Sequence, residues 1–154
     1  MLRIAINGYG RIGRSVLRAL YESGARDWAQ VVAINEPAET KTIAHLTRYD
    51  STHGRFPGTV ELDQQTLTVN GDAIQIVNHK DLRQLPWREQ DIDVVLECSG
   101  SFSDRATAQQ HITNGAKRVL FSQPAETSVD ATIVYGVNHQ ILDGLETIIS
   151  NASC

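Results

Sequence analysis

The feature that most constrains the fold of this chain is a glycine motif close to its amino terminus. Gly8, Gly10 and Gly13 form the pattern G-x-G-x-x-G, which directly follows a strand-like apolar run at Arg3–Asn7. A segment with apolar residues at helical spacing, Arg11–Ser23, begins inside the motif. In such a unit the first glycine permits a tight turn, the second lets backbone approach a pyrophosphate, and the third allows close helix packing. A ligand-free glycine turn is the alternative, but the placement between strand and helix favours phosphate binding.

Short apolar runs alternate with helix-period segments along the rest of the chain, a pattern typical of an α/β fold with a mostly parallel sheet. Further helices are expected at Thr40–Arg48 and Arg105–Asn114. Gly24 and Gly115 are placed to end the first and the last helix. The expected strands are Arg3–Asn7, Val31–Asn35, Val94–Cys98, Arg118–Ser122, Thr132–Tyr135 and Thr147–Ser150.

Between Thr59 and Val77 the pattern changes to alternating residues around Asn70-Gly71, which is a strong signal of a two-residue hairpin. The sequence therefore predicts one domain over residues 1–154. Its fold class is α/β: a Rossmann-type, doubly wound, mostly parallel sheet with a small antiparallel hairpin insertion.

Charge and composition exclude several classes of protein. The 154 residues carry a net charge of -4 without any run of like charges, so neither a nucleic-acid surface nor a membrane-surface helix is indicated. The longest apolar runs are far shorter than the roughly 20 residues of a membrane span, and the amino terminus lacks the pattern of a secretory signal. Only two cysteines are present, which fits a reducing cytoplasm.

Asn35 and Glu36 end the second expected strand, a little over 20 residues beyond Gly13, where dinucleotide folds place the acid that binds the adenosine ribose. A carboxylate at this position accepts hydrogen bonds from ribose hydroxyls and repels a 2′-phosphate, so NAD is favoured over NADP. The alternative is a solvated loop glutamate ahead of Pro37. Because glutamate is longer than the more usual aspartate, an indirect ribose contact is also left open.

The chain ends on Ser150–Cys154, where small polar residues and a thiol follow an isoleucine-rich strand. A cysteine at a helix start has a lowered pKa and can act as a nucleophile, although a lone cysteine is more often a small buried hydrophobe. Cys98, at the end of an apolar strand, is expected to be a core residue. The five histidines show no metal-ligand spacing, so no metal is expected.

Three segments together resemble the NAD-binding half of the glyceraldehyde-3-phosphate dehydrogenase family: INGYGRIGR at the amino terminus, YDSTHGRF at Tyr49–Phe56, and the closing SNASC. The resemblance extends through essentially the whole chain. Within the family, three segments look like the erythrose-4-phosphate dehydrogenase branch: Ile34–Glu36, Val119–Pro124 and Asp130–Asn138. The glyceraldehyde-3-phosphate branch, which acts in glycolysis, is the alternative.

The resemblance implies a covalent mechanism on an aldose phosphate. Cys154 would attack the aldehyde carbon as a thiolate, and hydride would then pass from the thiohemiacetal to NAD. The thioester would be released by water, giving 4-phosphoerythronate for pyridoxal phosphate synthesis, or by phosphate in the glyceraldehyde branch. A cytoplasmic homotetramer is implied for the full-length protein.

The resemblance also implies the site residues. Arg11 and Ile12 would lie on the pyrophosphate, Glu36 on the ribose, and Lys80, which replaces an arginine common in the family, near the adenine edge. Ser153 would shape the substrate pocket beside Cys154. The remaining residues expected along the adenosine and nicotinamide are Ser99, Gly100, Phe102 and Ser122.

In the family, the histidine that activates the thiol and the groups that bind the substrate phosphate follow this cysteine. The catalytic domain is therefore expected to be absent from this chain, which alone should bind NAD weakly and not oxidise aldehyde. A non-catalytic NAD-binding module is the alternative of another class. A short-chain reductase is disfavoured because no Tyr-x-x-x-Lys occurs.

Overall fold

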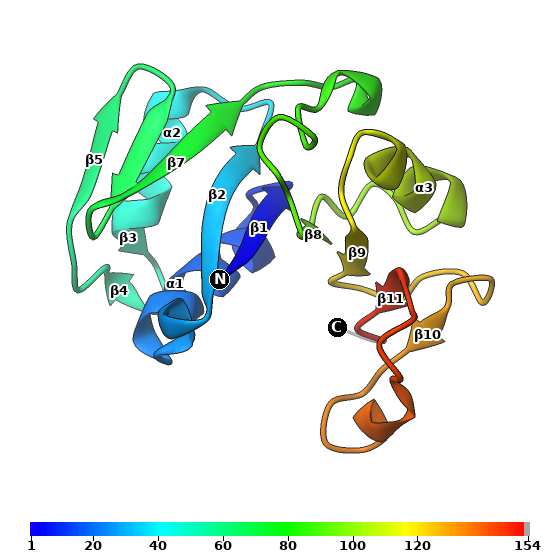
Figure 1. Cartoon of the computed structure of the whole chain (residues 1–154). Coiled ribbons are helices and arrows are strands. Elements are labelled where there is room, and N and C mark those ends of the chain that lie inside the picture. The colour runs from blue at the N-terminus through cyan, green and yellow to red at the C-terminus, as the bar shows by residue number, and fades with distance from the viewer. Residues whose placement is uncertain (153–154) are drawn as a thin grey trace.

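The computed structural model of the chain describes residues 1–152 and shows a long sheet flanked by helices (Figure 1). The strands are β1 (Leu2–Asn7), β2 (Ala29–Asn35), β3 (Tyr49–Asp50), β4 (Gly54–Arg55), β5 (Val60–Asp63), β6 (Thr66–Val69), β7 (Asp72–Val77), β8 (Val94–Glu97), β9 (Arg118–Phe121), β10 (Ala131–Thr132) and β11 (Ile148–Ser150). The helices are α1 (Arg11–Glu22), α2 (Thr40–Arg48) and α3 (Arg105–Thr113), with 3-10 turns η1 (Ala25–Asp27), η2 (Leu82–Gln84) and η3 (His139–Ile141).

Nine strands form the main sheet in the order β10-β11-β9-β8-β1-β2-β7-β6-β5. Every pairing from β10 across to β7 is parallel, with β1 between β2 and β8. The strand order reverses at β1, because the chain first runs outward to β2 and later returns to β8 on the other side. This is the doubly wound, mostly parallel sheet that the sequence predicts, and ligands bind in such folds at the point of reversal.

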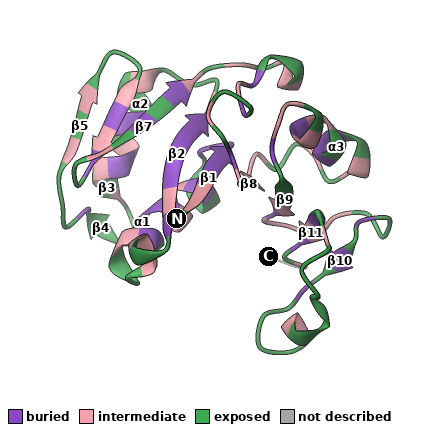
Figure 2. Ribbon diagram, in the orientation of Figure 1, coloured by how far each residue is buried: buried purple, intermediate pink, exposed green. Residues whose placement is uncertain are grey.

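Buried residues run along β1, β2 and β7 in the middle of the sheet (Figure 2). They belong to two separate hydrophobic clusters. Ile4 and Ile6 of β1 pack into one cluster together with Leu17 of α1. Ala5, between them, belongs to the other cluster, which includes Ala108 of α3. Since successive strand residues point to opposite faces, this alternation shows that α1 and α3 cover opposite faces of the sheet.

The helix ends lie where the glycines predict them. Helix α1 ends at Glu22, one residue before the expected end, and Gly24 follows with a φ of 80°. Helix α3 ends at Thr113, and Gly115 has a φ of 117°. Helix α2 has the predicted bounds. Positive φ is unfavourable for residues with a Cβ, so these two glycines stop their helices by leaving the helical conformation.

The antiparallel insertion is also confirmed. Asn70 and Gly71, with φ of 49° and 86°, join β6 to β7 as a two-residue hairpin. Both central residues thus have the positive φ of a type I′ turn, which Asn-Gly adopts readily. Strand β5 adds to β6 in antiparallel fashion, while β7 pairs in parallel with β2, so the insertion lengthens the main sheet.

Five predicted strands agree with the structure to within two residues at each end, the sixth ends early, and one small sheet was not predicted. The strand expected over Thr132–Tyr135 is only Ala131–Thr132. The Asn138 side chain explains the early end, because its Oδ1 accepts from the Val134 amide at 2.7 Å and its Nδ2 donates to the Thr132 carbonyl at 3.0 Å. These bonds replace ladder hydrogen bonds by a local turn. The unpredicted sheet pairs β3 with β4.

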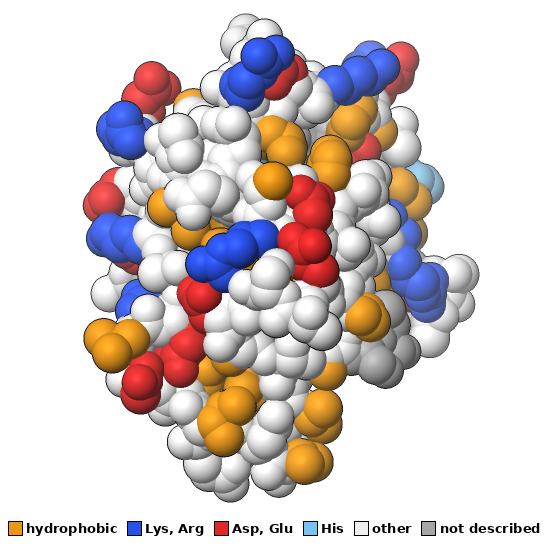
Figure 3. All heavy atoms as spheres, turned by 90° about the vertical axis from the view of Figure 1, so that its right-hand side faces the viewer, with side chains coloured by type: hydrophobic (Ala, Val, Ile, Leu, Met, Phe, Trp, Pro, Cys, Tyr) orange, Lys and Arg blue, Asp and Glu red, His pale blue; other side chains and the backbone are white. Residues whose placement is uncertain are grey.

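Hydrophobic side chains gather at the lower end of the face seen in Figure 3, over the turns that surround η3. Tyr135 and Leu145 are more than four-fifths exposed there. The exposed large hydrophobic residues of this segment are Val134, Tyr135, Val137, Ile141, Leu142 and Leu145. They lie apart from both buried clusters and do not contribute to the core.

Candidate functional site

The glycine turn between β1 and α1 leaves the amino end of the helix open. Gly10 is the N-cap, no side chain caps the helix, and its first turn holds no acidic residue. Helix α3 differs, because its N-cap Asp104 accepts hydrogen bonds from the amide and hydroxyl of Thr107 at 2.9 and 2.7 Å. The first amides of α1 therefore have no side-chain acceptor, and a helix end in this state binds phosphate.

Close packing requires glycine at two of the three motif positions, and the third glycine faces open space. A Cβ on Gly8, whose φ is 92°, would lie 2.5 Å from the Ser99 nitrogen. A Cβ on Gly13 would lie 2.5 Å from the Gly8 carbonyl oxygen and 3.1 Å from Cγ2 of Ile6, on the strand beneath the helix. A Cβ on Gly10 would meet no atom within 4 Å, so its place is free for a ligand to approach the backbone.

A cleft of about 360 Å³ lies at the carboxyl ends of β1, β2 and β8, beside this turn. Of the residues predicted to bind the cofactor, it brings together seven: Gly8, Gly10, Asn35, Glu36, Lys80, Ser99 and Phe102. The sequence reasoning missed six others that line it: Asn7, Pro37, His79, Leu82, Cys98 and Ser101. Position in the sequence could have indicated three of them, because Asn7 and Cys98 lie at the ends of expected strands and His79 directly precedes Lys80.

Glu36 stands at the cleft and holds the glycine turn in place. Its Oε2 accepts a hydrogen bond from the Tyr9 amide at 2.8 Å, and its Oε1 accepts from the Ala38 amide at 3.2 Å. Each carboxylate oxygen has a further lone pair, so both can still accept from a ligand hydroxyl. The residue thus joins β2 to the turn and presents negative charge at the cleft.

A second cleft of about 380 Å³ lies on the other side of Cys98, which lines both. Its lining is Ile12, Val16, Leu96, Cys98, Leu120, Ser122 and Asn151. Two of these, Ile12 and Ser122, are predicted cofactor residues. Burial raises the pKa of the Cys98 thiol to about 11, although a hydrogen bond with Ser122 works in the opposite direction. Cys98 thus packs against the core and also lines both clefts. Because of the raised pKa, its thiol is neutral at pH 7.

Three predicted cofactor residues line neither cleft. The Arg11 side chain reaches away to Thr52 and to Asp50, whose carboxylate lies 3.9 Å from it. Gly13 is covered by packing, and Gly100 has a φ of 72° in the loop after β8. The predicted catalytic Cys154 and its neighbour Ser153 lie outside the described residues.

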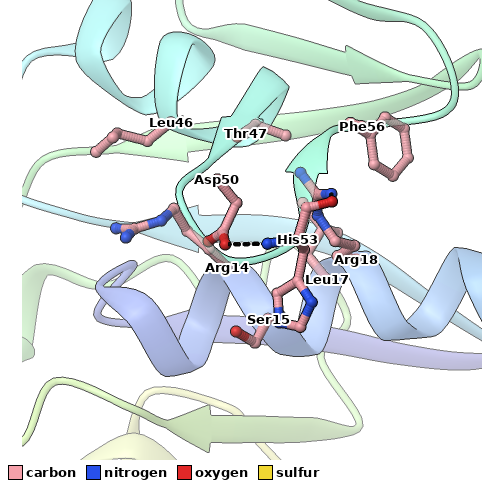
Figure 4. A pocket seen from close by; sticks show the side chains of 9 residues that line it. All are labelled: Arg14, Ser15, Leu17, Arg18, Leu46, Thr47, Asp50, His53 and Phe56. Atoms are coloured by element: carbon pink, nitrogen blue, oxygen red, sulfur yellow. Dashed lines mark hydrogen bonds between the residues drawn. The ribbon is translucent and has the colours of Figure 1, made fainter.

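A small cavity beside α1 belongs to the scaffold (Figure 4). Its volume of about 10 Å³ is room for one water molecule. In Figure 4, Asp50 accepts a hydrogen bond from the His53 amide at 2.8 Å, and Arg18 extends to the same loop, where it donates to the His53 and Gly54 carbonyls. The lining residues are Arg14, Ser15, Leu17, Arg18, Leu46, Thr47, Asp50, His53 and Phe56. The cavity is too small for a dinucleotide, and its polar groups attach the β3–β4 loop to α1.

Residues 1–152 contain no group of three or more His, Cys, Asp or Glu side chains placed to hold a metal ion. Within the same range, every helix is too short or too polar to cross a membrane.

The comparison with known families agrees with this geometry. Residues 2–105 match the sequence model of the family described as glyceraldehyde 3-phosphate dehydrogenase, NAD binding domain. The matched segment runs from the first residue of β1 to the start of α3 and contains the glycine turn, Glu36 and the whole lining of the first cleft.

Proposed function

We propose, from the premise that this chain belongs to the glyceraldehyde 3-phosphate dehydrogenase family as its NAD-binding domain, that the protein oxidises an aldose phosphate with NAD. The observation that carries the proposal is the uncapped amino end of α1, which opens on the first cleft beside Gly10. Its amides suit a pyrophosphate. NAD, when bound, supplies the acceptor for a hydride that leaves the substrate carbon.

The chain's own residues fit the two halves of a dinucleotide. The first cleft offers Glu36, whose negative charge suits ribose hydroxyls and opposes a 2′-phosphate. The second cleft is lined largely by apolar side chains and offers a flat ring a surface to pack on. Cys98 separates the two clefts, and Ile12 at the start of α1 reaches the second one. The pyrophosphate would then cross the glycine turn between them.

The reacting group would be Cys154. Asn151, three residues earlier, lines the second cleft, which supports a place for the thiol close to the hydride acceptor. The thiolate would add to the aldehyde carbon, and the resulting oxyanion would take up a proton to give a thiohemiacetal. The thiohemiacetal would then lose the hydride from that carbon to bound NAD and its hydroxyl proton to solvent, which leaves a thioester. Water or phosphate would release the acid or acyl phosphate and restore the thiol. Ser153 would border the substrate.

Erythrose 4-phosphate is the first candidate substrate, because three segments resemble the erythrose-4-phosphate dehydrogenase branch of the family: Ile34–Glu36, Val119–Pro124 and Asp130–Asn138. Glyceraldehyde 3-phosphate is the second candidate, because it is the substrate in the family's name. The cytoplasm and a homotetramer are proposed for the full-length protein on the same resemblance.

Calorimetric titration of the 154-residue chain with NAD and with NADP tests the cofactor proposal. NAD should bind more tightly, and Glu36→Gln should reduce that preference because it removes the charge that opposes the 2′-phosphate. Equal binding of the two dinucleotides by the unmodified chain would contradict the role of Glu36.

Turnover by the full-length protein tests the reaction. Its kcat/KM should be higher with erythrose 4-phosphate than with glyceraldehyde 3-phosphate plus phosphate, and Cys154→Ala should abolish both activities. The reverse preference would assign the protein to the glyceraldehyde branch. NAD binding without turnover of either sugar would support the non-catalytic module, and activity that survives Cys154→Ala would overturn the covalent mechanism.

A further inference from the structure

A buried carboxylate, Glu97, ends β8 and accepts hydrogen bonds from four donors. Its Oε2 lies 2.8 Å from Asn7 Nδ2 and 2.7 Å from His111 Nε2. Its Oε1 accepts from the amide of Ser99 at 3.1 Å and from the Ser99 hydroxyl at 2.5 Å. Burial by itself would raise the pKa of Glu97, but its interactions with His111, together with the hydrogen bonds from Ser99 and Asn7, outweigh burial and hold the pKa below its usual range. Glu97 is therefore an ionised group that bears no solvent contact.

Trp87 fixes the orientation of the His111 ring beside this carboxylate. The indole Nε1 of Trp87 lies 3.0 Å from His111 Nδ1, and an indole nitrogen can only donate. His111 Nδ1 is consequently an acceptor without a proton, and the proton of the neutral ring is on Nε2, where it is donated to Glu97. A second proton on Nδ1 would point at the indole N–H. The hydrogen bond from Trp87 thus assigns the proton that faces Glu97 to Nε2 of the ring.

A chain of side-chain amides leads from Glu97 to the opposite wall of the first cleft. Asn35 Oδ1 accepts from the His79 amide at 2.9 Å, and Asn35 Nδ2 donates to Asn7 Oδ1 at 2.7 Å. Asn7 Nδ2 then donates to Glu97. The His79 amide fixes the orientation of Asn35 at one end, and the carboxylate fixes that of Asn7 at the other. These three hydrogen bonds all point toward Glu97, and Asn35 Nδ2 also donates to the His79 carbonyl at 3.0 Å, which ties Asn35 more firmly to that wall.

We infer that Glu97 is a positioning residue for the dinucleotide cleft: it holds the wall at Ser99 directly and the wall at His79–Lys80 through Asn7 and Asn35. Ser99 donates both its amide and its hydroxyl hydrogen bond to Glu97. It therefore shapes the cleft through the position of its backbone and not through its side chain. His79 and Lys80 line the facing side. The inference rests on the proposed function, in that the cleft is taken to hold NAD.

Glu97→Gln keeps the shape of the side chain but not its hydrogen bonds. A glutamine has one oxygen and one NH₂ group, so its nitrogen must face either the two donors at Oε2 or the two Ser99 donors. If the nitrogen faces Asn7, the Asn7 amide must turn, and its Nδ2 then faces Asn35 Nδ2. Asn35 can accept from Asn7 only by turning as well, and this releases the His79 amide. If it faces Ser99, the loop after β8 is released instead. Either outcome loosens a wall of the cleft.

The test combines NAD titration with hydrogen exchange at single amides in the 154-residue chain. Glu97→Gln should raise the Kd for NAD about tenfold or more, as expected for loss of hydrogen bonds to a charged group. Amide exchange at His79 or Ser99 should accelerate by a similar factor. Asp130→Asn is the matched control, because Asp130 also accepts several hydrogen bonds but ties β10 to the residues before β11. It should leave the Kd and both amides within about twofold of the parent.

Asn7→Ala provides a second variant in which the carboxylate stays. It cuts only the amide chain, so exchange should accelerate at His79 and stay slow at Ser99. The inference is overturned if the parent binds NAD and Glu97→Gln binds it equally well, or if the exchange of His79 is unchanged in Asn7→Ala. An equal rise of Kd in Asp130→Asn would show general destabilisation and also overturn it. If the parent chain and full-length protein fail to bind NAD, the proposed function fails, whereas the exchange results still decide the role of Glu97.

Discussion

The glycine turn allows stability and binding to be separated by two matched substitutions. Gly10→Ala adds a methyl group where the structure has no atom within 4 Å, at a φ of -76° that alanine adopts freely. The free energy of unfolding should therefore change by less than about 0.5 kcal/mol. The same methyl group stands where the pyrophosphate must approach the backbone. Overlap of this kind opposes binding by about 1–3 kcal/mol, which is roughly a 5- to 150-fold rise in the Kd for NAD.

Gly8→Ala should show the opposite result for stability. Its methyl group would lie 2.5 Å from the Ser99 nitrogen, and its φ of 92° disfavours any residue with a Cβ. Positive φ is unfavourable by about 1–2 kcal/mol and overlap with backbone by about 1–3 kcal/mol, so roughly 3 kcal/mol is expected. For a domain of this size that is a fall in Tm of about 6–12 °C.

Thermal unfolding followed by circular dichroism, together with calorimetric titration of NAD, measures both effects. The reasoning would be refuted if Gly10→Ala bound NAD as tightly as the parent chain, because the space at Gly10 would then not be the path of the pyrophosphate. It would equally be refuted if Gly8→Ala kept the parent Tm, since the approach of Ser99 to the turn would then be looser than the structure shows.

Three further predictions concern titrating groups. Burial raises the pKa of Tyr9 to about 12, although a hydrogen bond with Thr47 works in the opposite direction, so the phenol should stay protonated at pH 11 in an ultraviolet titration. The stability that this shift contributes is complete below pH 10 and should fall as the pH rises toward 12, and ionisation of the phenol near pH 10 would contradict the prediction. Hydrogen bonds from the Thr147 amide, Arg105 and the Ile148 amide lower the pKa of Asp130 to about 2, so its contribution to stability should be present above pH 3.8 and lost as the pH falls toward 2. Carbon NMR titration of the carboxyl group measures this pKa, and an ordinary value would show that these hydrogen bonds are absent. In a Cys154→Ser variant, iodoacetamide at pH 7.5 should alkylate Cys98 much more slowly than it alkylates a free thiol, because burial raises the pKa of Cys98 to about 11, and bound NAD should slow the reaction further. Rapid alkylation that NAD does not slow would place the thiol away from the clefts.

Local signals predicted the fold well where one residue decides the backbone. Gly24 and Gly115 mark helix ends because only glycine adopts their φ readily, and Asn70-Gly71 marks a turn for the same reason. The end of β10 could not be predicted in this way. It depends on the Asn138 side chain, which competes for the backbone of Thr132 and Val134, and nothing in the apolar run itself indicates that competition.

The candidate site was predictable as far as it is made of backbone. The glycine motif predicts the turn, and the spacing to Glu36 predicts the acid near the adenosine. Glu97 and His111 were missed because they lie 14 positions apart and meet only when α3 packs on the sheet. Buried groups of this kind are uncommon, so neither residue stands out in the sequence as a member of a buried pair.

The central position of β1 also has a consequence for the order in which the protein forms during synthesis. One edge of β1 meets β2, which follows within the first 35 residues, but the other edge meets β8, where Asn7 pairs with Glu97. The half-sheet from β1 to β5 is complete once Val77 has left the ribosome, while about 20 further residues are needed before β8 can cover the open edge. At about 5–20 residues per second this interval lasts roughly 1–4 s, during which an apolar strand edge is available to other nascent chains.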